Sequence, residues 1–446
     1  MKVRAIILAA GKGTRMKSAQ TKVLHELCGR PMLWYTIAAL RAAGVDEMLV
    51  VSNDQLQSRL PDFGVQGVIQ EKQLGTGHAV QVALKELAQA DGRVIIAYGD
   101  MPLVGSNVFS AVLDRLDRER DASVAMVTAR MPLPSSFGRV LRTGDDVARI
   151  VEERDCTPEQ KAIDEMNAGI YAFDEQALRK SIAELRNDNA QNEYYLTDTI
   201  ESLVNAGNRV VPVLASDHHD VLGVNDRSEL ARARREMNAR LCDQYMAQGV
   251  TIIDPMTTYL EPELIFGRDT VVYPNCTISR LTEVGEACVI GPNSRLSNAK
   301  VGARSTVRES VILDSVLGED TTVGPFAHIR ANGNLGARVH IGNFVEVKNS
   351  TLSSGVKTSH LSYLGDATVG ENTNVGAGTI TCNYDGVRKN RTQIGRDAFI
   401  GSNTSLVAPI NIGDGALTGA GSVVTKDVPG GERVAGNPAR PLPKKS

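Results

Sequence analysis

The stretch "LAAGKGTRM", residues 8–16, places two glycines and two basic residues directly after a short apolar run. With Gly11, Gly13 and Arg15, it matches neither a P-loop, which needs G-x-x-x-x-G-K-[ST], nor a dinucleotide fingerprint, which needs G-x-G-x-x-G. Glycines still let backbone N–H groups approach an anion, and a following helix end favours negative charge. The stretch therefore indicates a loop that holds phosphate groups; the alternative is a tight strand–helix turn with solvated charges.

Asp100 is the second candidate, because it ends the apolar run "RVIIAYGD". Mg²⁺ takes one or two oxygens from a protein and completes its shell with phosphates and water. A carboxylate at a strand end that faces a phosphate loop fits this role. Helix capping is the alternative.

The second half of the chain carries polar residues of a different kind. Glu346 and Lys348 lie two residues apart in "EVKN", so both side chains face the same side of a strand. His360 and Tyr363 lie in "SHLSYLG", where the repeat described below is interrupted, and His is the usual general base in proteins. Residues 382–393 form an insertion long enough to project toward a neighbouring coil.

Other reactive side chains are interpreted as structural. His328 and His340 belong to this class, because a lone His more often supports the fold than catalyses. Cys382 has no base among its sequence neighbours, so we interpret it as lining a pocket. The six cysteines form no C-x-x-C pair, which favours reduced thiols in a cytoplasmic protein over a disulfide framework or a zinc site.

The elements that position the first candidates follow an α/β pattern up to about residue 225. The runs "RAIILAA", "EMLVVS", "RVIIAYGD" and "ASVAMVTA" are typical of buried parallel strands. Between them, "PMLWYTIAALRAAG" and "GTGHAVQVALKELAQA" have apolar residues three and four apart, as amphipathic helices do. This order predicts a doubly wound α/β sheet. Ligands of such sheets bind beyond the carboxyl ends of the strands, where both "LAAGKGTRM" and Asp100 lie.

Residues 226–249 predict one long charged helix between two regions of different composition. Asp226 and Glu229 have capping-box spacing, and Gly249 ends the pattern. One helical face carries the apolar residues Leu230, Met237, Leu241 and Tyr245.

Beyond this helix the sequence repeats every six residues. Three arrays keep this register: Phe266, Val272, Ile278, Val284, Ile290 and Leu296; Val323, Ile329, Leu335, Ile341 and Val347; and Ile394, Ile400, Leu406, Ile412, Thr418 and Val424. Such hexapeptides predict a parallel β-helix whose stacked coils bury a continuous core. The register slips near residues 297–320, where we expect short turns or loops to adjust the coil.

Composition excludes several classes of protein. The 446 residues are 42% hydrophobic and 23% charged, which is ordinary for two or three globular domains. A net charge of −3 gives no bulk attraction to nucleic acid or to an anionic membrane. The apolar run at residues 5–10 is too short for a signal peptide, and no stretch approaches the length of a membrane span.

Taken together, the two halves resemble one family, the bifunctional N-acetylglucosamine-1-phosphate uridyltransferase/glucosamine-1-phosphate N-acetyltransferases. The resemblance covers essentially the whole length. Its motifs, in order, are "LAAGKGTRM", "KVLHELCGRPML", "QLGTGHAV", "YGDMPL", "NAGIYAF", "NEYYLTD" and "GVNDR", then "FAHIR", "FVEVKNS", "SHLSYLGDATVGENTNVGAGTITCNYDG" and "IGSNTSLVAP". It implies a uridyltransferase domain at 1–227, a linker helix at 228–248, a left-handed β-helix acetyltransferase domain at 249–446, and a homotrimer.

The resemblance also implies two reactions. Acetyl passes from acetyl-CoA to the amine of glucosamine 1-phosphate. Uridyl then passes from UTP to N-acetylglucosamine 1-phosphate with Mg²⁺, and pyrophosphate leaves. The product, UDP-N-acetylglucosamine, is a precursor of peptidoglycan and lipopolysaccharide.

For uridyl transfer, the resemblance implies that Arg15 and Lys22 neutralise charge in the transition state and that Asp100 and Asn225 hold Mg²⁺. Because the attacking sugar phosphate is already anionic, this step needs no general base. Helix capping is the alternative for Asn225. Thr21 stands where the family usually has Pro, which bears on the rigidity of the loop rather than on the role of Lys22.

The resemblance further implies a binding surface for the sugar nucleotide. Gln70, Gly75 and Thr76 match the segment that reads uracil, and Glu193 weakly matches a sugar contact. The whole set is Leu8, Ala9, Ala10, Gly11, Lys22, Gln70, Gly75, Thr76, Tyr98, Gly99, Asp100, Gly138, Glu152, Asn167 and Asn225.

For acetyl transfer, the resemblance implies that His360 is the general base, and we expect Glu346 to orient its imidazole. Arg330 and Lys348 match positions that bind the sugar phosphate, and Tyr363 and Asn374 match positions that orient the sugar. The positions that match acetyl-CoA contacts are Ala377, Asn383, Tyr384, Ser402 and Ala420.

Two rival functions remain at this point. The first is a single-activity nucleotidyltransferase that makes ADP-glucose or GDP-mannose, with a purely regulatory β-helix; it gives no reason for His360 or for the insertion. The second is a non-enzymatic trimeric scaffold, which does not explain "LAAGKGTRM".

Overall fold

The computed structural model describes residues 2–189 and 191–442. Contacts within the chain divide it into two compact units, with the boundary between Met237 and Asn238. The boundary falls inside one helix, α8 (Arg227–Ala247).

The first unit is built on a mixed sheet with the strand order β11-β7-β10-β6-β1-β4-β5, and β8 pairs with both β10 and β9. β1 is parallel to β4 and β6, while β10 is antiparallel to both β6 and β7. The strands are β1 (Lys2–Leu8), β4 (Glu47–Ser52), β5 (Gln66–Ile69), β6 (Gly92–Tyr98), β7 (Ala122–Arg130), β8 (Arg139–Thr143), β9 (Asp146–Val151), β10 (Glu165–Asp174) and β11 (Arg209–Leu214), with a small separate pair β2 (Glu26–Leu27) and β3 (Arg30–Pro31). The predicted α/β class is confirmed, with β10 reversed among the parallel strands of the main strand order and β9 reversed beside β8.

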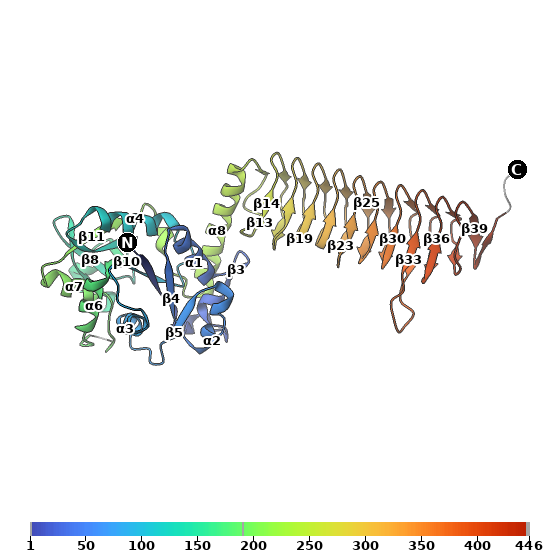
Figure 1. Cartoon of the computed structure of the whole chain (residues 1–446). Coiled ribbons are helices and arrows are strands. Elements are labelled where there is room, and N and C mark those ends of the chain that lie inside the picture. Colours follow the sequence, from blue (N-terminus) through green and yellow to red (C-terminus); the bar gives the residue numbers. More distant parts are fainter. Residues whose placement is uncertain (1, 190, 443–446) are drawn as a thin grey trace. The chain divides into compact units, whose positions relative to one another are not determined.

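Helices cover both faces of this sheet (Figure 1). Alternate residues of β1 point to opposite layers: Ala5 and Ile7 pack with α1 and α4, whereas Ile6 and Leu8 pack with α3, α6 and α7. The α-helices of this unit are α1 (Met32–Ala42), α2 (Asp54–Gln57), α3 (Thr76–Glu86), α4 (Ser106–Arg118), α5 (Pro158–Lys161), α6 (Glu175–Ala183) and α7 (Asp198–Asn205). The short 3-10 helices are η1 (Thr14–Met16), η2 (Lys22–Leu24), η3 (Leu60–Phe63), η4 (Glu153–Asp155) and η5 (His218–Val221).

The start of α8 is fixed by its cap. The carboxylate of Asp226 accepts hydrogen bonds from the N–H groups of Ser228 (2.8 Å) and Glu229 (2.9 Å). The carboxylate of Glu229 reaches back to the N–H of Asn225 (2.6 Å) rather than to that of Asp226. The predicted capping box is therefore shifted by one residue, and it fixes the backbone of Asn225.

The second unit is a left-handed parallel β-helix with three faces (Figure 1). The hexapeptide pattern predicts the parallel β-helix, and the family resemblance implies its left hand. The first face contains β12 (Thr251–Ile252), β15 (Val271–Val272), β18 (Val289–Ile290), β20 (Thr306–Val307), β22 (Thr322–Val323), β25 (His340–Asn343), β28 (Lys357–His360), β31 (Asn374–Val375), β34 (Phe399–Ile400), β37 (Leu417–Thr418), β39 (Arg433–Gly436) and β40 (Ala439–Pro441). The second contains β13 (Tyr259–Leu260), β16 (Thr277–Ser279), β19 (Arg295–Val301), β21 (Val311–Leu317), β23 (His328–Arg330), β26 (Glu346–Lys348), β29 (Tyr363–Gly365), β32 (Ile380–Cys382), β35 (Ser405–Val407) and β38 (Val423–Val424). The third contains β14 (Ile265–Phe266), β17 (Glu283–Val284), β24 (Asn334–Leu335), β27 (Thr351–Leu352), β30 (Ala367–Val369), β33 (Thr392–Ile394) and β36 (Ile410–Ile412).

The slip in the hexapeptide register has a simple structural cause. Ile278 pairs with Leu296, 18 residues on, but Leu296 pairs with Ile312, only 16 residues on. β19 and β21 are seven-residue strands that continue from the second face onto the third. The adjustment expected near residues 297–320 is made by short corners: one positive-φ residue, Asn298 in β19 and Asp314 in β21, turns each strand from the second face onto the third.

A buried triad of charged residues stabilises the first unit at the amino-terminal ends of its parallel strands. Glu175 forms ion pairs with Arg4 and with Arg179 (2.9 Å), and its side chain is fully buried. The two guanidinium groups also donate to the carbonyl oxygens of Ala88 (2.7 Å) and Leu84 (2.8 Å), at the end of α3. The triad thus joins β1, α3 and α6.

We predict that Glu175→Gln destabilises the first unit by about 3–5 kcal/mol, because it leaves two guanidinium groups without a counter-charge in a buried site. Differential scanning calorimetry of the full chain measures this as a lower transition temperature. Asp62→Asn, which breaks an exposed pair with Arg59, is the control and should change stability by about 1 kcal/mol or less. An unchanged transition in Glu175→Gln would contradict the role given to the triad.

Candidate active sites

The first candidate site lies at the carboxyl edge of the sheet. The N–H of Ala9 donates to the carbonyl of Val51 (2.9 Å), and the N–H of Gly99 donates to that of Leu8 (3.0 Å). Because β1, β4 and β6 are parallel, these bonds bring the segment after β1 beside Asp100. The strand order therefore assembles a site from loops that are far apart in the sequence.

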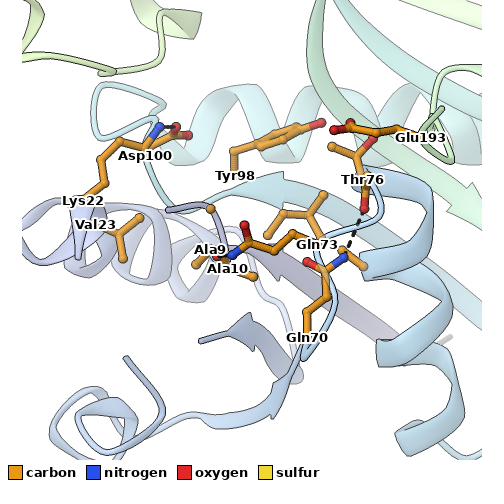
Figure 2. A pocket seen from close by; sticks show the side chains of 14 residues that line it. Ala9, Ala10, Lys22, Val23, Gln70, Gln73, Thr76, Tyr98, Asp100 and Glu193 are labelled. Carbon is orange, nitrogen blue, oxygen red and sulfur yellow. Dashed lines mark hydrogen bonds and ion pairs between the residues drawn. The ribbon is translucent and has the colours of Figure 1, made fainter. Parts of the chain in front are cut away.

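A cavity of about 280 Å³ opens at this edge (Figure 2). It is lined by Leu8, Ala9, Ala10, Gly11, Lys22, Val23, Gln70, Gln73, Gly75, Thr76, Ala79, Tyr98, Asp100 and Glu193. The members of the expected sugar-nucleotide set that do not line it are Gly99, Gly138, Glu152, Asn167 and Asn225.

The Lys22 ammonium connects the two residues expected to hold a metal ion. Its Nζ forms an ion pair with Asp100 and lies 3.1 Å from the amide oxygen of Asn225. The side chains of Lys22 and Asp100 are only 14% and 17% exposed. A carboxylate oxygen and an amide oxygen that converge on one cation form the hard oxygen set that Mg²⁺ prefers. The donor set therefore fits Mg²⁺.

Helix capping does not explain either of these residues. Asp226, not Asn225, caps α8. Asp100 lies before α4, whose first residue is Ser106 and whose N-cap is Gly105. The side chains of Asp100 and Asn225 are free of capping roles and are both turned toward Lys22.

Arg15 does not line the same cavity as Lys22. It is exposed and lines a neighbouring cavity of about 420 Å³, together with Asn225 and Arg232. The adjacent Met16 is buried in a cluster with residues of α1 and α8, which leaves Arg15 on the outside of the turn. Arg15 and Lys22 therefore line two neighbouring cavities, and the contact between Lys22 and Asn225 joins them.

Thr21 keeps the loop before Lys22 ordered without a proline. Its φ of −60° is the value that proline would impose. Its hydroxyl accepts a hydrogen bond from the amide of Asn53 (3.2 Å), and its carbonyl accepts one from the N–H of Leu24 (3.1 Å). A tertiary hydrogen bond from Asn53 thus holds this turn, where the family usually has the rigid ring of proline.

The segment that contains Gln70, Gly75 and Thr76 is held by a second, distant segment. The N–H of Gly77 donates to the carbonyl of Tyr194, and the N–H of Tyr194 donates to that of Leu74, both at 2.8 Å. Gly75 has φ +108°, and a Cβ there would lie 2.6 Å from the Tyr194 carbonyl oxygen. Only glycine fits this close approach.

Gly138, Glu152 and Asn167 gather beside this cavity without lining it. The N–H of Asn167 donates to the carbonyl of Gly138 (2.9 Å), and the hydroxyl of Thr197 donates to Glu152 (3.0 Å). Burial raises the pKa of Glu152. Burial first, and then the charges of Glu152 and Asp100, raise the pKa of Tyr98, so its phenol stays protonated and can donate a hydrogen bond into the cavity.

Two residues of this region were not predicted. The amide of Gln73 donates to the carbonyl of Ala10 (2.6 Å) and so holds the first loop. Burial, followed by repulsion from Glu152, raises the pKa of Asp198 to about 6. The only sequence signal for either is its position in a quoted motif, "QLGTGHAV" for Gln73 and "NEYYLTD" for Asp198.

In the second unit, the expected base and several expected acetyl-CoA contacts occupy one ladder. Asn343, His360, Ala377, Ser402 and Ala420 stand at the same corner of successive coils. The backbone bonds that show this are Leu361 N–H to Asn343 O (3.0 Å), Gly378 N–H to His360 O (3.2 Å), Asn403 N–H to Ala377 O (2.6 Å) and Gly421 N–H to Ser402 O (2.7 Å). The imidazole of His360 is exposed at this corner.

Glu346 does not orient His360. The imidazole Nδ1 lies 2.5 Å from the amide oxygen of Asn343, whereas Glu346 pairs with Arg330 (2.6 Å). His360 ends β28 on the first face, and Asn343 is its register partner there. Glu346 begins β26 beyond the corner, on the second face, so that expectation is wrong.

Three cations gather on the second face. Lys389, from the insertion, contacts Lys348; this hydrogen bond and the charges of Lys389 and Arg330 lower the pKa of Lys348. Lys389 was not predicted, although it lies in the insertion that the sequence singles out. Close like charges of this kind indicate a site for an anion.

The insertion forms a hairpin that projects from the β-helix (Figure 1). Its base is held by Asn383, whose amide donates to Asp366 (2.5 Å) and lies 3.5 Å from the hydroxyl of Tyr363. Its turn is organised by Asp385, whose pKa is lowered to about 2 by the N–H groups of Arg388 and Val387.

The remaining expected residues are less closely grouped. Tyr384 is 62% exposed on the hairpin, and Cys382 is half-buried at the end of β32. Asn374 lies on the first face, opposite Lys357, whereas Tyr363 lies on the second face. The structure therefore does not bring Tyr363 and Asn374 onto one face.

Comparison with known proteins gives two domain families. Residues 5–195 match the family model of the MobA-like NTP transferase domain, and residues 391–426 match that of the hexapeptide repeat of succinyl-transferase. Curated relatives cover both units. They include the bifunctional protein GlmU of Acetivibrio thermocellus (44% identical; 95% of this chain and 93% of the relative covered) and that of Trichlorobacter lovleyi (46%; 95% and 94%).

The two folds, together with the glycine-rich loop at residues 8–16, define a class of enzymes. In this class a nucleotidyltransferase domain is joined to a hexapeptide-repeat acyltransferase domain. The identity extends along nearly the whole chain, and the bifunctional protein GlmU of Staphylococcus haemolyticus is a further example (43%; 96% of each chain). The chain belongs to the family of the bifunctional GlmU proteins. Among the residues described, each helix is too short or too polar to cross a membrane.

Proposed function

We propose that this enzyme makes UDP-N-acetylglucosamine at two separate sites. Residues 1–227 carry out uridyl transfer, residues 249–446 carry out acetyl transfer, and residues 228–248 link them. The observation that carries the proposal is that each unit has its own cluster of functional groups: the contacts of Lys22 in the first, and the ladder through His360 in the second.

In uridyl transfer, a phosphate oxygen of N-acetylglucosamine 1-phosphate attacks the α-phosphorus of UTP, and pyrophosphate leaves. The attacking group is anionic, so the chain has to bind, align and neutralise charge rather than remove a proton. Backbone N–H groups near Gly11 and the ammonium of Lys22 meet the phosphates in the cavity. Arg15, in the neighbouring cavity beside Asn225, neutralises the leaving pyrophosphate.

Asp100 and Asn225 would hold Mg²⁺, which would supply positive charge to the phosphates of UTP. Gln70, Gly75 and Thr76 bind the base. Tyr98, Gly138, Glu152 and Asn167 form the sugar side, where a protonated phenol and a buried carboxyl offer one donor and one acceptor.

In acetyl transfer, the amine of glucosamine 1-phosphate attacks the thioester carbon of acetyl-CoA, and CoA leaves. His360 takes the proton that the amine loses. The contact of its Nδ1 with Asn343 leaves Nε2 for this task. Acetyl-CoA lies along the ladder of Ala377, Ser402 and Ala420.

The remaining groups of the second site bind and orient the substrates. Arg330, Lys348 and Lys389 bind the sugar phosphate. Their closeness, which lowers the pKa of Lys348, supports a site for an anionic substrate on the second face. Tyr363 and Asn374 orient the sugar, and Asn383 and Tyr384 contact acetyl-CoA. We further propose a cytoplasmic homotrimer, in which the hairpin reaches a neighbouring subunit.

We predict that Asp100→Ala abolishes Mg²⁺-dependent uridyl transfer and leaves acetyl transfer near normal, because the two chemistries use different units. Both half-reactions are assayed on the same preparation. Asp62→Ala, which removes an exposed carboxylate of the same unit, is the control. Comparable loss of both activities in a folded Asp100→Ala variant would contradict the two-site proposal.

We predict that His360→Ala lowers kcat for acetyl transfer by about 10²–10⁴-fold, the usual effect of removing a positioned base. Release of CoA with glucosamine 1-phosphate is the measurement, and uridyl transfer should stay intact. His340→Ala is the matched control, because His340 is an exposed His on the same face, bonded to Thr322. More than roughly a tenth of wild-type kcat in His360→Ala would assign the base to another group. No CoA release by the wild type would favour a single-activity enzyme.

We predict that a chain ending at Gln248 keeps uridyl transfer, loses acetyl transfer and is monomeric. The first unit has its own buried layers on both faces of its sheet, so it retains its core without the β-helix. Analytical ultracentrifugation and the two assays measure the outcome. A trimer of residues 1–248 would place the subunit contacts in the wrong unit.

A further inference from the structure

The side chain of Gln70 is buried at the edge of the first cavity, and its amide nitrogen is turned toward neighbouring groups of the protein. Its amide nitrogen lies 3.2 Å from the carbonyl oxygen of Gly75 and 3.0 Å from Nδ1 of His78. Figure 2 shows its amide oxygen on the opposite side, toward Ala10 and Gln73, which line the cavity with it.

Simple chemistry determines which way this amide faces. The carbonyl of Gly75 can only accept a hydrogen bond, so the atom that faces it must be the NH₂ group of Gln70. Nδ1 of His78, which faces the same NH₂ group, must then be an unprotonated acceptor. The imidazole proton therefore resides on Nε2, and an interaction of the ring with the Lys72 backbone acts to raise the pKa of His78.

The surroundings of His78 keep this ring neutral. It is half-buried on α3, against Gln70 and the Lys72 backbone on one side and the ring of Tyr194 at 6.4 Å on another. Burial, and then the charge of Lys85 on the same helix, lower the pKa of His78 below its ordinary value. His78 does not line the cavity, so it acts through Gln70.

We propose that His78 is a positioning residue for base selection: it holds Gln70 so that the amide oxygen, an acceptor, faces the base. This inference rests on the proposed binding of UTP in the cavity. An acceptor at this point pairs with a pyrimidine that carries a proton on N3, as uracil does. It opposes the N3 lone pair of cytosine, because two acceptors would then face each other unpaired.

The two orientations of the Gln70 amide differ in free energy by the hydrogen bonds that each one makes. To present NH₂ to cytosine, Gln70 would turn its oxygen toward Gly75 and His78 and lose both hydrogen bonds. Without the Nδ1 acceptor, only the bond to Gly75 opposes this rotation. One hydrogen bond of this kind corresponds to about 3- to 10-fold in an equilibrium, so discrimination should fall by about that factor.

The test uses two variants that keep different atoms of the ring. His78→Asn carries an acceptor oxygen near the position of Nδ1, whereas His78→Gln reaches the position of Nε2 and can keep the contact with Lys72. The ratio of kcat/KM for UTP to that for CTP is measured for uridyl transfer in the full-length enzyme. We expect His78→Gln to lower this ratio by about 3- to 10-fold, mainly through a lower KM for CTP, and His78→Asn to stay within about twofold of the wild type.

The controls separate positioning from a general structural role. His340→Gln makes the same change in the β-helix and should leave the ratio unchanged. Equal ratios in His78→Asn and His78→Gln, or equal loss with UTP and CTP in both, would overturn the proposal. If the wild type fails to turn over UTP, the proposed function fails instead. Isothermal titration calorimetry of UTP and CTP binding to the same variants then tests His78 by itself. We expect the preference for UTP over CTP to fall in His78→Gln and to persist in His78→Asn. An unchanged preference in both variants would overturn the proposal.

Discussion

The contact of one ammonium group with two oxygens is the interaction on which the first site depends. Lys22 meets Asp100, 78 residues later, and Asn225, 203 residues later. Partly buried charges must be compensated, so the three segments that carry these groups are held in one arrangement. The strand order places Asp100, the cap of α8 places Asn225, and the hydrogen bond from Asn53 to Thr21 places Lys22. The geometries of these three segments are therefore coupled at this point.

The second unit depends on a different constraint, the stacking of coils. Each residue lies over its equivalent in the preceding coil, so functional groups that meet are one coil apart, as His360 and Asn343 are. The hairpin adds residues between Ala377 and Ser402, yet Thr381 still pairs with Leu406 and the buried core continues. A β-helix can thus insert functional loops at its corners without disturbing the packing that stabilises it.

The two units also treat charge differently. In the first unit, carboxyl groups such as those of Glu152 and Asp198 are buried near one another, which raises their pKa values and suits neutral hydroxyl groups of a sugar. In the second unit, cations gather on an open face around Lys348, which suits an anionic substrate that arrives from solvent. The chemistry assigned to each site follows this contrast between enclosed carboxyl groups and exposed positive charge.

The sequence by itself determined both folds, because alternating α/β elements and six-residue periods are local patterns that burial imposes on the chain. It also determined the candidates Lys22, Asp100 and His360, through motifs whose residue types suit phosphate and proton chemistry. The tertiary structure alone decided their partners. Asn343 rather than Glu346 bonds to His360, because the corner between two faces separates residues that are close in sequence. Arg15 lines a second cavity because the burial of Met16 turns the loop, and Lys389 meets Lys348 because a hairpin folds back. Long-range packing sets these contacts, and a local pattern carries no information about it.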